Sequence, residues 1–287
     1  MNTVDMDVVV CAKNQAKTMD QVLHQIVRDI PFKNLIVVYG PSTDDTRETA
    51  EQHTDKVFYD GDKGLGAARS LGIKKASSEI VAMIDSDIIL TKGWYHQLIG
   101  HLQDPKVAAV MGTCVYGYGY KPLQSYWEYQ RRTAQTNYGC QNTMFRREAV
   151  LKVGNFNETI RGAGEDYDLY SRLLAAGYKW VWVREASVYH PMTMREYLKH
   201  VRWWTQGAPY TEEVAKWAQT TSVLRVYVRQ FFFMLESFRT AVKLAVVVHP
   251  TFLLYWPLIR MTFVSQVLRE LKKARVGRLG ANQESPV

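Results

Sequence analysis

The protein has 287 residues, of which 47% are apolar and 22% are charged, with 18 glycines and 9 prolines. This composition excludes disordered, collagen-like and low-complexity chains, and the length suits one large domain with an appendage or two smaller domains. Three scattered cysteines, Cys11, Cys114 and Cys140, have neither the even number of a disulfide framework nor the spacing of metal ligands, so a reducing compartment fits best.

The net charge of +8 is concentrated at one end of the chain. Residues 1–213 contain 25 basic and 25 acidic side chains, whereas residues 214–287 contain 11 and 3. A neutral body with a cationic appendage points to a nucleic acid or an anionic membrane surface as a partner. The start, Met1 to Asp7, carries two aspartates and no basic apolar run, so we expect it not to be a secretory signal peptide.

The first part of the chain alternates short apolar runs with helix-compatible stretches. This alternation predicts βαβ units and a largely parallel sheet covered on both faces. The ligand crevice of such a sheet lies beyond the carboxyl ends of its strands, so polar residues just after a strand are candidates for chemistry. The predicted strands are 8–11, 35–39, 57–59, 80–84 and 107–111, and the predicted helices are 18–28, 43–53, 65–76 and 94–103.

After residue 112 the pattern becomes irregular. Residues 116–120 alternate Tyr and Gly, and a helix is expected at 125–133. A further helix is expected at 166–176, where Gly177 ends it. Residues 186–189 are strand-like.

The last segment differs in kind, because residues 223–248 are mostly apolar. At about 100° per residue, six of its polar side chains fall within an arc of about 100°, which predicts a helix with one narrow basic stripe. Residues 244–259 carry no formal charge but include two prolines, and as helix they fall short of a hydrocarbon core of about 30 Å, so a clean span is not expected. The six side chains are Arg225, Arg229, Glu236, Arg239, Thr240 and Lys243.

A wide apolar face beside basic residues is typical of a helix that lies in a membrane interface. The alternative is a helical subdomain packed on the body, with its charges solvated. We favour the membrane, because the run from Phe231 to Leu235 would cover more than one packing face. The predicted domains are therefore 1–207, catalytic, and 208–287, a basic, aromatic-rich helical region for membrane association.

The sharpest local feature is the run Ile84-Asp85-Ser86-Asp87, which ends an otherwise apolar predicted strand. Two carboxylates this close repel each other and are costly at a buried strand end unless a cation or hydrogen-bond donors compensate them. A divalent ion bound by carboxylates and phosphate oxygens meets that requirement. An isolated Asp-x-Asp is more commonly a turn or a cap, but this position at a strand end favours a metal site.

Two further runs precede predicted helices. The run Gly162-Ala163-Gly164-Glu165-Asp166 is either a helix cap or a carboxylate that its glycines bring near a ligand, where it would act as a base. The run Lys63-Gly64-Leu65-Gly66-Ala67-Ala68-Arg69 could turn the amino end of a helix toward phosphate. It is not the Walker pattern and follows the third strand, which argues against dinucleotide binding.

Six motifs follow one another along the chain, namely Val8-Val9-Val10-Cys11-Ala12-Lys13-Asn14, Ser42-Thr43-Asp44, Gly66-Ala67-Ala68-Arg69, Asp85-Ser86-Asp87, Asn142-Thr143-Met144-Phe145-Arg146-Arg147 and Gly164-Glu165-Asp166-Tyr167-Asp168-Leu169. In this order they resemble the family 2 glycosyltransferases of GT-A fold, over roughly residues 5–207. The resemblance implies an α/β fold with a GT-A (Rossmann-like) mixed, mostly parallel sheet flanked by helices, to which the amphipathic helical C-terminal region is added. It also implies a nucleotide-diphosphate-sugar donor, a divalent metal ion (Mn or Mg) and inversion at the anomeric carbon.

Matching the sequence to the family position by position implies which residues bind the donor. It implies that Ala12 and Asn14 line the nucleotide pocket, with Arg69 beside it, and that Asp85 faces the ribose and the diphosphate. The family usually has an acidic pair after the second strand, but Tyr39 and Gly40 stand there in this sequence. Tyr39 could stack on the base in its place, or the nearby aspartate of the Ser-Thr-Asp motif could reach the base, so the nucleotide stays open.

The resemblance also assigns the metal ligands and the base. It implies that Asp87 binds the metal ion with Asp85, and that His190 occupies the place of a further ligand, although a lone histidine is more often structural. Asp166 would be the general base that deprotonates the acceptor hydroxyl, with Glu165 beside it.

Arg202-Trp203 resembles the end of the Gln-x-x-Arg-Trp motif of processive family members. Lys199 stands in place of the glutamine, so processive polymer synthesis is not expected. Contact of Arg202 and Trp203 with the acceptor or the diphosphate is expected instead. The other interpretation is a cationic and aromatic rim that stabilises the body.

These features predict a metal-dependent inverting glycosyltransferase that transfers a sugar from a nucleotide-diphosphate sugar to a lipid-linked or glycan acceptor. We expect a peripheral or monotopic protein on the cytoplasmic face of a membrane, and no nucleic-acid partner, because an apolar run adjoins the basic residues. One alternative is a nucleotidyltransferase, against which the lack of glycine from Cys11 to Lys17 argues. The other is a non-catalytic protein that binds nucleotide sugars, which the departure at Tyr39 and Gly40 would favour.

Overall fold

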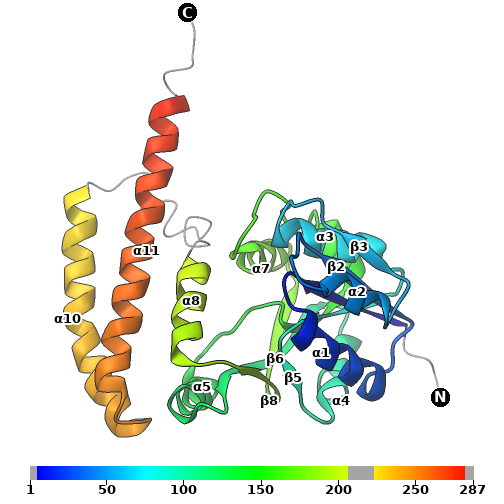
Figure 1. Ribbon diagram of the computed structural model, residues 1–287, viewed down its shortest axis with the longest axis horizontal. Coiled ribbons are helices and arrows are strands. Elements are labelled where there is room, and N and C mark those ends of the chain that lie inside the picture. The colour runs from blue at the N-terminus through cyan, green and yellow to red at the C-terminus, as the bar shows by residue number, and fades with distance from the viewer. Residues whose placement is uncertain (1–4, 206–222, 282–287) are drawn as a thin grey trace, which may run out of the picture. The chain divides into compact units, whose positions relative to one another are not determined.

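The computed structural model describes residues 5–205 and 223–281. The chain divides into two compact units, Met1–Met192 and Thr193–Val287. The sheet belongs to the first unit, and the described part of the second unit is helical (Figure 1). The predicted domain boundary between residues 207 and 208 lies outside the described residues.

Among residues 5–205, eight strands form one sheet in the order β3-β2-β1-β4-β7-β6-β8-β5. Strands β3, β2, β1 and β4 are parallel to their neighbours in this group, and β6 is parallel to β8, whereas β7 and β5 pair antiparallel. The predicted mixed, mostly parallel sheet is confirmed. The strands are β1 (Met6–Ala12), β2 (Asn34–Tyr39), β3 (Val57–Tyr59), β4 (Ile80–Asp85), β5 (Ile89–Leu90), β6 (Val107–Tyr118), β7 (Asn142–Arg146) and β8 (Lys179–Pro191).

Helices flank the sheet (Figure 1). Helix α1 buries Met19, Val22, Leu23 and Ile26, whose spacing of three and four residues places them on one helix face. Helix α3 packs on β1 and β2, and α4 packs on β6 and β8. The helices of this unit are α1 (Ala16–Asp29), α2 (Thr46–Glu51), α3 (Leu65–Lys75), α4 (Trp94–Ile99), α5 (Lys121–Thr133), α6 (Arg147–Lys152) and α7 (Glu165–Ala175), with the 3-10 helix η1 (Gly100–Gln103).

After residue 112, where the sequence pattern is irregular, two long-range strand pairings organise the chain. Strand β6 continues to Tyr118 and pairs with β8, although the register shifts between Tyr116 and Tyr118. Gly117, with φ +83°, lies at that shift and adopts a conformation that glycine tolerates without strain. Strand β7 inserts antiparallel between β4 and β6. The alternating Tyr and Gly residues therefore belong to an irregular strand.

Aromatic rings of the buried core pack around strand β7. Phe145 of β7 is fully buried and meets Phe156 and Trp180 edge to face, with ring centroids 6.1 and 5.4 Å apart.

The carboxyl ends of β1, β2 and β4 are aligned. Cys11 of β1 lies opposite Asp85 of β4 on one side and opposite β2 on the other. The segments that follow these three parallel strands therefore lie side by side at one edge of the sheet.

The described part of the second unit contains α8 (Met194–Thr205), α10 (Val223–Val247) and α11 (Phe252–Ala281). Helix α11 packs against both α8 and α10. The helix predicted at 223–248 is confirmed as α10, where Arg239 and Lys243 are exposed, while the side chains of Arg225 and Arg229 lie outside the description. Within the described ranges, no helix combines the length and apolar character needed to cross a bilayer.

Gly66 opens α3 at a close approach between segments. A Cβ atom on Gly66 would collide with the carbonyl oxygens of Asn157 and Ile160, whereas a Cβ atom on Gly100 would meet nothing within 4 Å. Gly66→Ala is expected to lower the free energy of unfolding by about 1–3 kcal/mol through overpacking. Gly100→Ala, at a helical backbone position, should leave it unchanged or raise it by up to about 1 kcal/mol. Urea denaturation measures both, and equal stabilities would contradict the close approach.

Candidate active site

A buried arginine joins the acidic motif at the end of β4 to the acidic motif at the start of α7. Arg69, in the second turn of α3, is 6% exposed. Its Nη2 lies 3.1 Å from Asp85 Oδ1, and its Nη1 donates a hydrogen bond to Glu165 Oε1. Three sequence motifs therefore meet at one guanidinium group, although 96 positions separate Arg69 from Glu165.

Burial governs the ionisation of this group of side chains. Burial raises the pKa of Glu165 to about 7, although the charge of Arg69 opposes this. Burial also raises the pKa of Asp85, where Arg69 lowers it and Asp87 raises it further. Burial disfavours the charge on Arg69, yet the neighbouring carboxylates hold its pKa well above the usual value. Burial therefore makes the carboxyl groups around Arg69 harder to ionise, and the charge of Arg69 partly offsets this effect.

Asp166 follows Glu165 in the first turn of α7. The preceding residue, Gly164, has φ +109°, which glycine adopts without steric cost. Asp166 Oδ1 accepts a hydrogen bond of 2.8 Å from the backbone N of Tyr167. Burial raises the pKa of Asp166, while Arg69 lowers it. A carboxylate with a raised pKa holds a proton more firmly than an ordinary aspartate does, which suits proton abstraction.

Asp87 and His190 form a second contact beside this group. His190 Nε2 lies 3.2 Å from Asp87 Oδ2, and Gln15 Nε2 donates to the same oxygen at 3.4 Å. The imidazole stacks on the ring of Tyr116, with centroids 5.3 Å apart. Burial lowers the pKa of His190, but the hydrogen bond and the charge of Asp87 outweigh it and raise the pKa overall. The structure thus pairs two residues that lie 103 positions apart in the printed sequence.

Asp87 and His190 offer a carboxylate oxygen and an imidazole nitrogen 3.2 Å apart. This mixed pair has the chemistry that Mn²⁺ accepts, and the neighbouring carboxylate of Asp85 is of the type that Mg²⁺ prefers. Burial raises the pKa of Asp85 and the charge of Asp87 raises it further, so keeping both carboxylates ionised costs free energy. A bound cation would reduce that cost.

Hydrogen bonds join the loop after β1 to the loop after β2. Asn14, with φ +53°, donates its backbone N–H to Ser42 Oγ at 3.0 Å and accepts from Thr43 N at 2.7 Å through its side chain. Asp44 Oδ2 accepts a hydrogen bond of 3.0 Å from Ala16 N at the start of α1. Asp44, one of the two residues that the sequence offered for contact with the base, is therefore engaged in holding these loops together.

The end of β2 carries an aromatic residue with a carboxylate beside it. Tyr39 lies opposite Ala12 of β1, and its carbonyl accepts a 3.0 Å hydrogen bond from Asp60 N. Asp60 is 9% exposed, and a Cβ atom on Gly40 would lie 3.4 Å from its Oδ2. The sequence analysis missed this buried acid. Its position directly after the strand predicted at 57–59 was the available signal.

Comparison with known sequences decides the family. The sequence model described as "Glycosyl transferase family 2" matches residues 7–161, which is more than half of the chain. The chain belongs to glycosyl transferase family 2. The resemblance inferred from the six ordered motifs is thereby confirmed.

Relatives of this family 2 chain include the pre-mycofactocin glycosyltransferase of Mycobacterium tuberculosis, 29% identical over 65% of this chain and 42% of the relative. The poly-beta-1,6-N-acetyl-D-glucosamine synthase of Staphylococcus aureus is 26% identical over 79% of this chain and 56% of its own length. The chain spans about half the length of the curated relatives it matches.

A solved structure with a similar fold is a mannosyltransferase from Pyrobaculum calidifontis in complex with GDP-Man and Mn²⁺. It has a TM-score of 0.61 and 16% identity, and the match covers 93% of this chain and 87% of that one. Glucosyl-3-phosphoglycerate synthase from Mycobacterium tuberculosis, with Mg²⁺ and UDP, has a TM-score of 0.50 and 19% identity over 72% and 79% of the two chains. At these identities the likeness shows a shared fold, and the GT-A architecture expected for a family 2 member is confirmed.

Two expected site residues lie in the second unit of this family 2 chain. Arg202 and Trp203 are adjacent on α8, and both are exposed. The Trp203 ring lies 6.4 Å from the ring of His200 on the same helix. Their contact with an acceptor or diphosphate stays a prediction.

Glu165 makes the stability of the protein depend on pH. Between pH values of about 4.5 and about 7, the folded protein keeps a proton on Glu165 that the unfolded chain has released. The bound proton stabilises the folded state, so the free energy of unfolding falls as the pH rises through this range. From about pH 4.5 to about pH 8, the wild type should lose up to about 3 kcal/mol of unfolding free energy relative to Glu165→Gln. Urea denaturation across this range measures the difference.

Glu158→Gln provides a matched control of opposite sign. A hydrogen bond from Lys74 lowers the pKa of Glu158, so the stability that its carboxylate contributes is present at neutral pH and lost as the pH falls. A difference between wild type and Glu165→Gln that stays constant with pH would contradict the buried titration of Glu165.

Proposed function

We propose that this chain is an inverting glycosyltransferase that transfers a sugar from a nucleotide-diphosphate sugar to an acceptor hydroxyl. The observation that carries the proposal is the buried contact of Arg69 with both Asp85 and Glu165. It supports a single site in which the acids of the donor side and the acids of the acceptor side act together. That site lies at the carboxyl edge of an α/β sheet, where ligands of such folds bind.

On the donor side, the nucleotide would occupy the space beside the ends of β1, β2 and β3. The small side chain of Ala12 leaves room for it, and the Asn14 loop borders it. Tyr39 would stack on the base, and Asp60 would accept a hydrogen bond from it, which replaces the acid missing after β2. Asp85, oriented by Arg69 at 3.1 Å, would face the ribose and the diphosphate.

Departure of the nucleotide places negative charge on the diphosphate. A divalent metal ion, Mn²⁺ or Mg²⁺, would be held by Asp87, Asp85 and His190 and would neutralise that charge where it develops. Gln15 and Tyr116 hold Asp87 and His190 in position before the donor arrives. This pre-organisation reduces the rearrangement that the reaction itself requires.

On the acceptor side, Asp166 would take the proton of the hydroxyl as its oxygen attacks the anomeric carbon. Attack from the face opposite the leaving nucleotide inverts the configuration at that carbon. The backbone N–H of Tyr167 orients the Asp166 carboxylate at 2.8 Å. Glu165 is held by Arg69 and so fixes the start of α7, on which Asp166 lies.

Asp166→Asn should lower kcat for sugar transfer by about 10²- to 10⁴-fold, because the variant cannot accept the acceptor proton. Asp87→Asn should raise the Mn²⁺ concentration needed for half-maximal transfer, because it removes a ligand. Sugar transfer is measured with a panel of sugar nucleotides and Mn²⁺, with and without lipid extract. Asp104→Asn, on an exposed acid paired with Lys179, serves as the control and should keep wild-type activity. Unchanged transfer in both site variants would exclude this site.

We further propose that the protein acts at the cytoplasmic face of a membrane, on a lipid-linked acceptor. Side chains spaced three and four residues apart along α10 form an exposed apolar face, which we call the α10 face. Arg239 and Lys243 are exposed on the same helix. A broad apolar face with adjacent cations suits an anionic membrane interface. The α10 face consists of Phe231, Leu235, Phe238, Val242 and Val246, which are 48–82% exposed.

The double variant Phe231→Ser with Phe238→Ser should bind vesicles of phosphatidylcholine and phosphatidylglycerol at least about tenfold more weakly, because each buried phenylalanine contributes about 1.5–3 kcal/mol. The matched control, Val27→Ser with Leu174→Ser, changes two exposed apolar residues of the first unit and should bind as the wild type does. Vesicle flotation measures binding. Equal flotation of the two double variants would count against the α10 face.

A further inference from the structure

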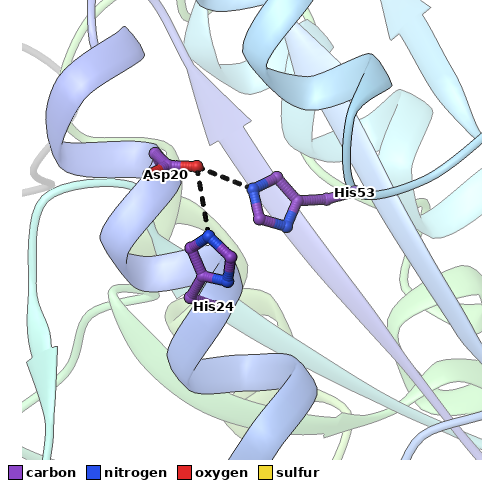
Figure 2. Close-up of side chains that lie close together, drawn as sticks. All are labelled: Asp20, His24 and His53. Atoms are coloured by element: carbon purple, nitrogen blue, oxygen red, sulfur yellow. Dashed lines mark hydrogen bonds and ion pairs between the residues drawn. The ribbon is translucent and has the colours of Figure 1, made fainter.

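Three side chains outside the proposed reaction converge beside α1. Asp20 and His24 lie one turn apart on α1, and His53 lies in the turn that follows α2. His53 Nε2 is 2.8 Å from Asp20 Oδ1, and His24 Nε2 is 3.7 Å from the same oxygen. Figure 2 shows both imidazole rings directed at this one carboxylate. We call these three residues the histidine cluster.

The distances in the histidine cluster are close to those of a metal site. Its three ligand atoms all lie within 4.8 Å of one another. Two ligands of a tetrahedral Zn²⁺ ion, with bonds of about 2.0–2.1 Å, are separated by about 3.3 Å. The separations of 2.8 and 3.7 Å lie on either side of this value. Because the His24 side chain is 72% exposed, a small rotation about its side-chain bonds can bring it to bonding distance.

The fold holds the other two ligands in place. The backbone N of His53 donates to Ala50 O at 3.0 Å, and the next residue, Thr54, donates through its hydroxyl to Leu35 O of β2 at 2.7 Å. The His53 side chain is only 8% exposed. Asp20 follows Met19 of α1, whose side chain is fully buried. Ligands that are already ordered lower the entropic cost of binding an ion.

The chemistry of the ligands selects the type of ion. Two imidazole nitrogens and one carboxylate oxygen favour a transition-metal ion over Mg²⁺ or Ca²⁺, which prefer oxygen ligands throughout. His24 pairs with Asp20 across one helical turn, and its ring meets the His53 ring edge to face with centroids 4.6 Å apart, so all three side chains converge on one point. The exposure of His24 leaves a fourth position open to water, as in zinc sites with three protein ligands.

We propose that the histidine cluster binds a divalent transition-metal ion, with Zn²⁺ as the best fit, at a site separate from Asp85 and Asp87. The ion ties α1 to the end of α2. Hydrogen bonds already join the starts of these two helices, with Gln15 N donating to Thr46 Oγ1 at 2.9 Å. Occupancy therefore stiffens the loops that border the proposed nucleotide pocket, and it stabilises the folded state by mass action.

The test measures Zn²⁺ binding by isothermal titration calorimetry, and thermal unfolding with and without Zn²⁺, on full-length protein without a histidine tag. The wild type should bind one more Zn²⁺ ion per chain than His24→Ala or His53→Ala does. If a variant still binds this ion, its affinity should be at least tenfold lower than that of the wild type. Zn²⁺ should raise the Tm of the wild type more than that of either variant. His24→Ala changes an exposed side chain, so its folding in the absence of metal should match the wild type.

Two controls separate the histidine cluster from other ligands. His101→Ala, on an exposed histidine in η1, should leave Zn²⁺ binding and the Tm shift unchanged. Asp87→Asn should lose metal binding at the proposed catalytic site. It should keep the Zn²⁺ ion of the histidine cluster, which His24→Ala loses. Equal stoichiometry, affinity and Tm shift in the wild type and His24→Ala would overturn the proposal.

Discussion

The arrangement of the site depends on one positive charge buried between two carboxylates. Arg69 is almost inaccessible to solvent and contacts both Asp85 and Glu165. Leaving a buried charge without its partner costs about 3–5 kcal/mol, so the three elements that carry these residues are constrained to stay together. The same contact fixes the end of β4 and the start of α7, and these are the two places where the proposed chemistry needs an oriented acid.

Local sequence patterns were sufficient for the first half of the sheet. The strands up to residue 84 are continuous apolar runs because helices cover their sheet, and polar residues follow them directly. Strand β7 was missed and β6 was predicted only as far as residue 111, because their pairing joins segments far apart in the chain and an irregular register accommodates Gly117. Periodicity within a short window carries no information about such pairing.

The motifs located the acids, but tertiary contacts decide what each acid does. The pairing of Asp87 with His190, and the stacking of His190 on Tyr116, depend on β4, β6 and β8 meeting in the folded sheet. Asp44 illustrates the opposite case, since a residue that could have reached the nucleotide instead holds the first turn of α1. The convergence of Asp20, His24 and His53 likewise has no signature in the sequence, because the loop and strand between α1 and α2 separate the third residue from the first two.

The antiparallel direction of β7 brings the preceding segment, residues 134–141, along the sheet edge that carries the proposed active site. Arg184 donates to Ala134 O at one end of this segment, and the backbone N of Asp85 donates to Gln141 O at the other. Within it, the charge of Asp166 contributes to raising the pKa of Tyr138, after burial as the main cause, so the segment also borders the proposed base. Insertions between two fixed anchors cost little folding free energy. Changes in the length of this segment can therefore alter the proposed acceptor side and leave the proposed donor side unchanged.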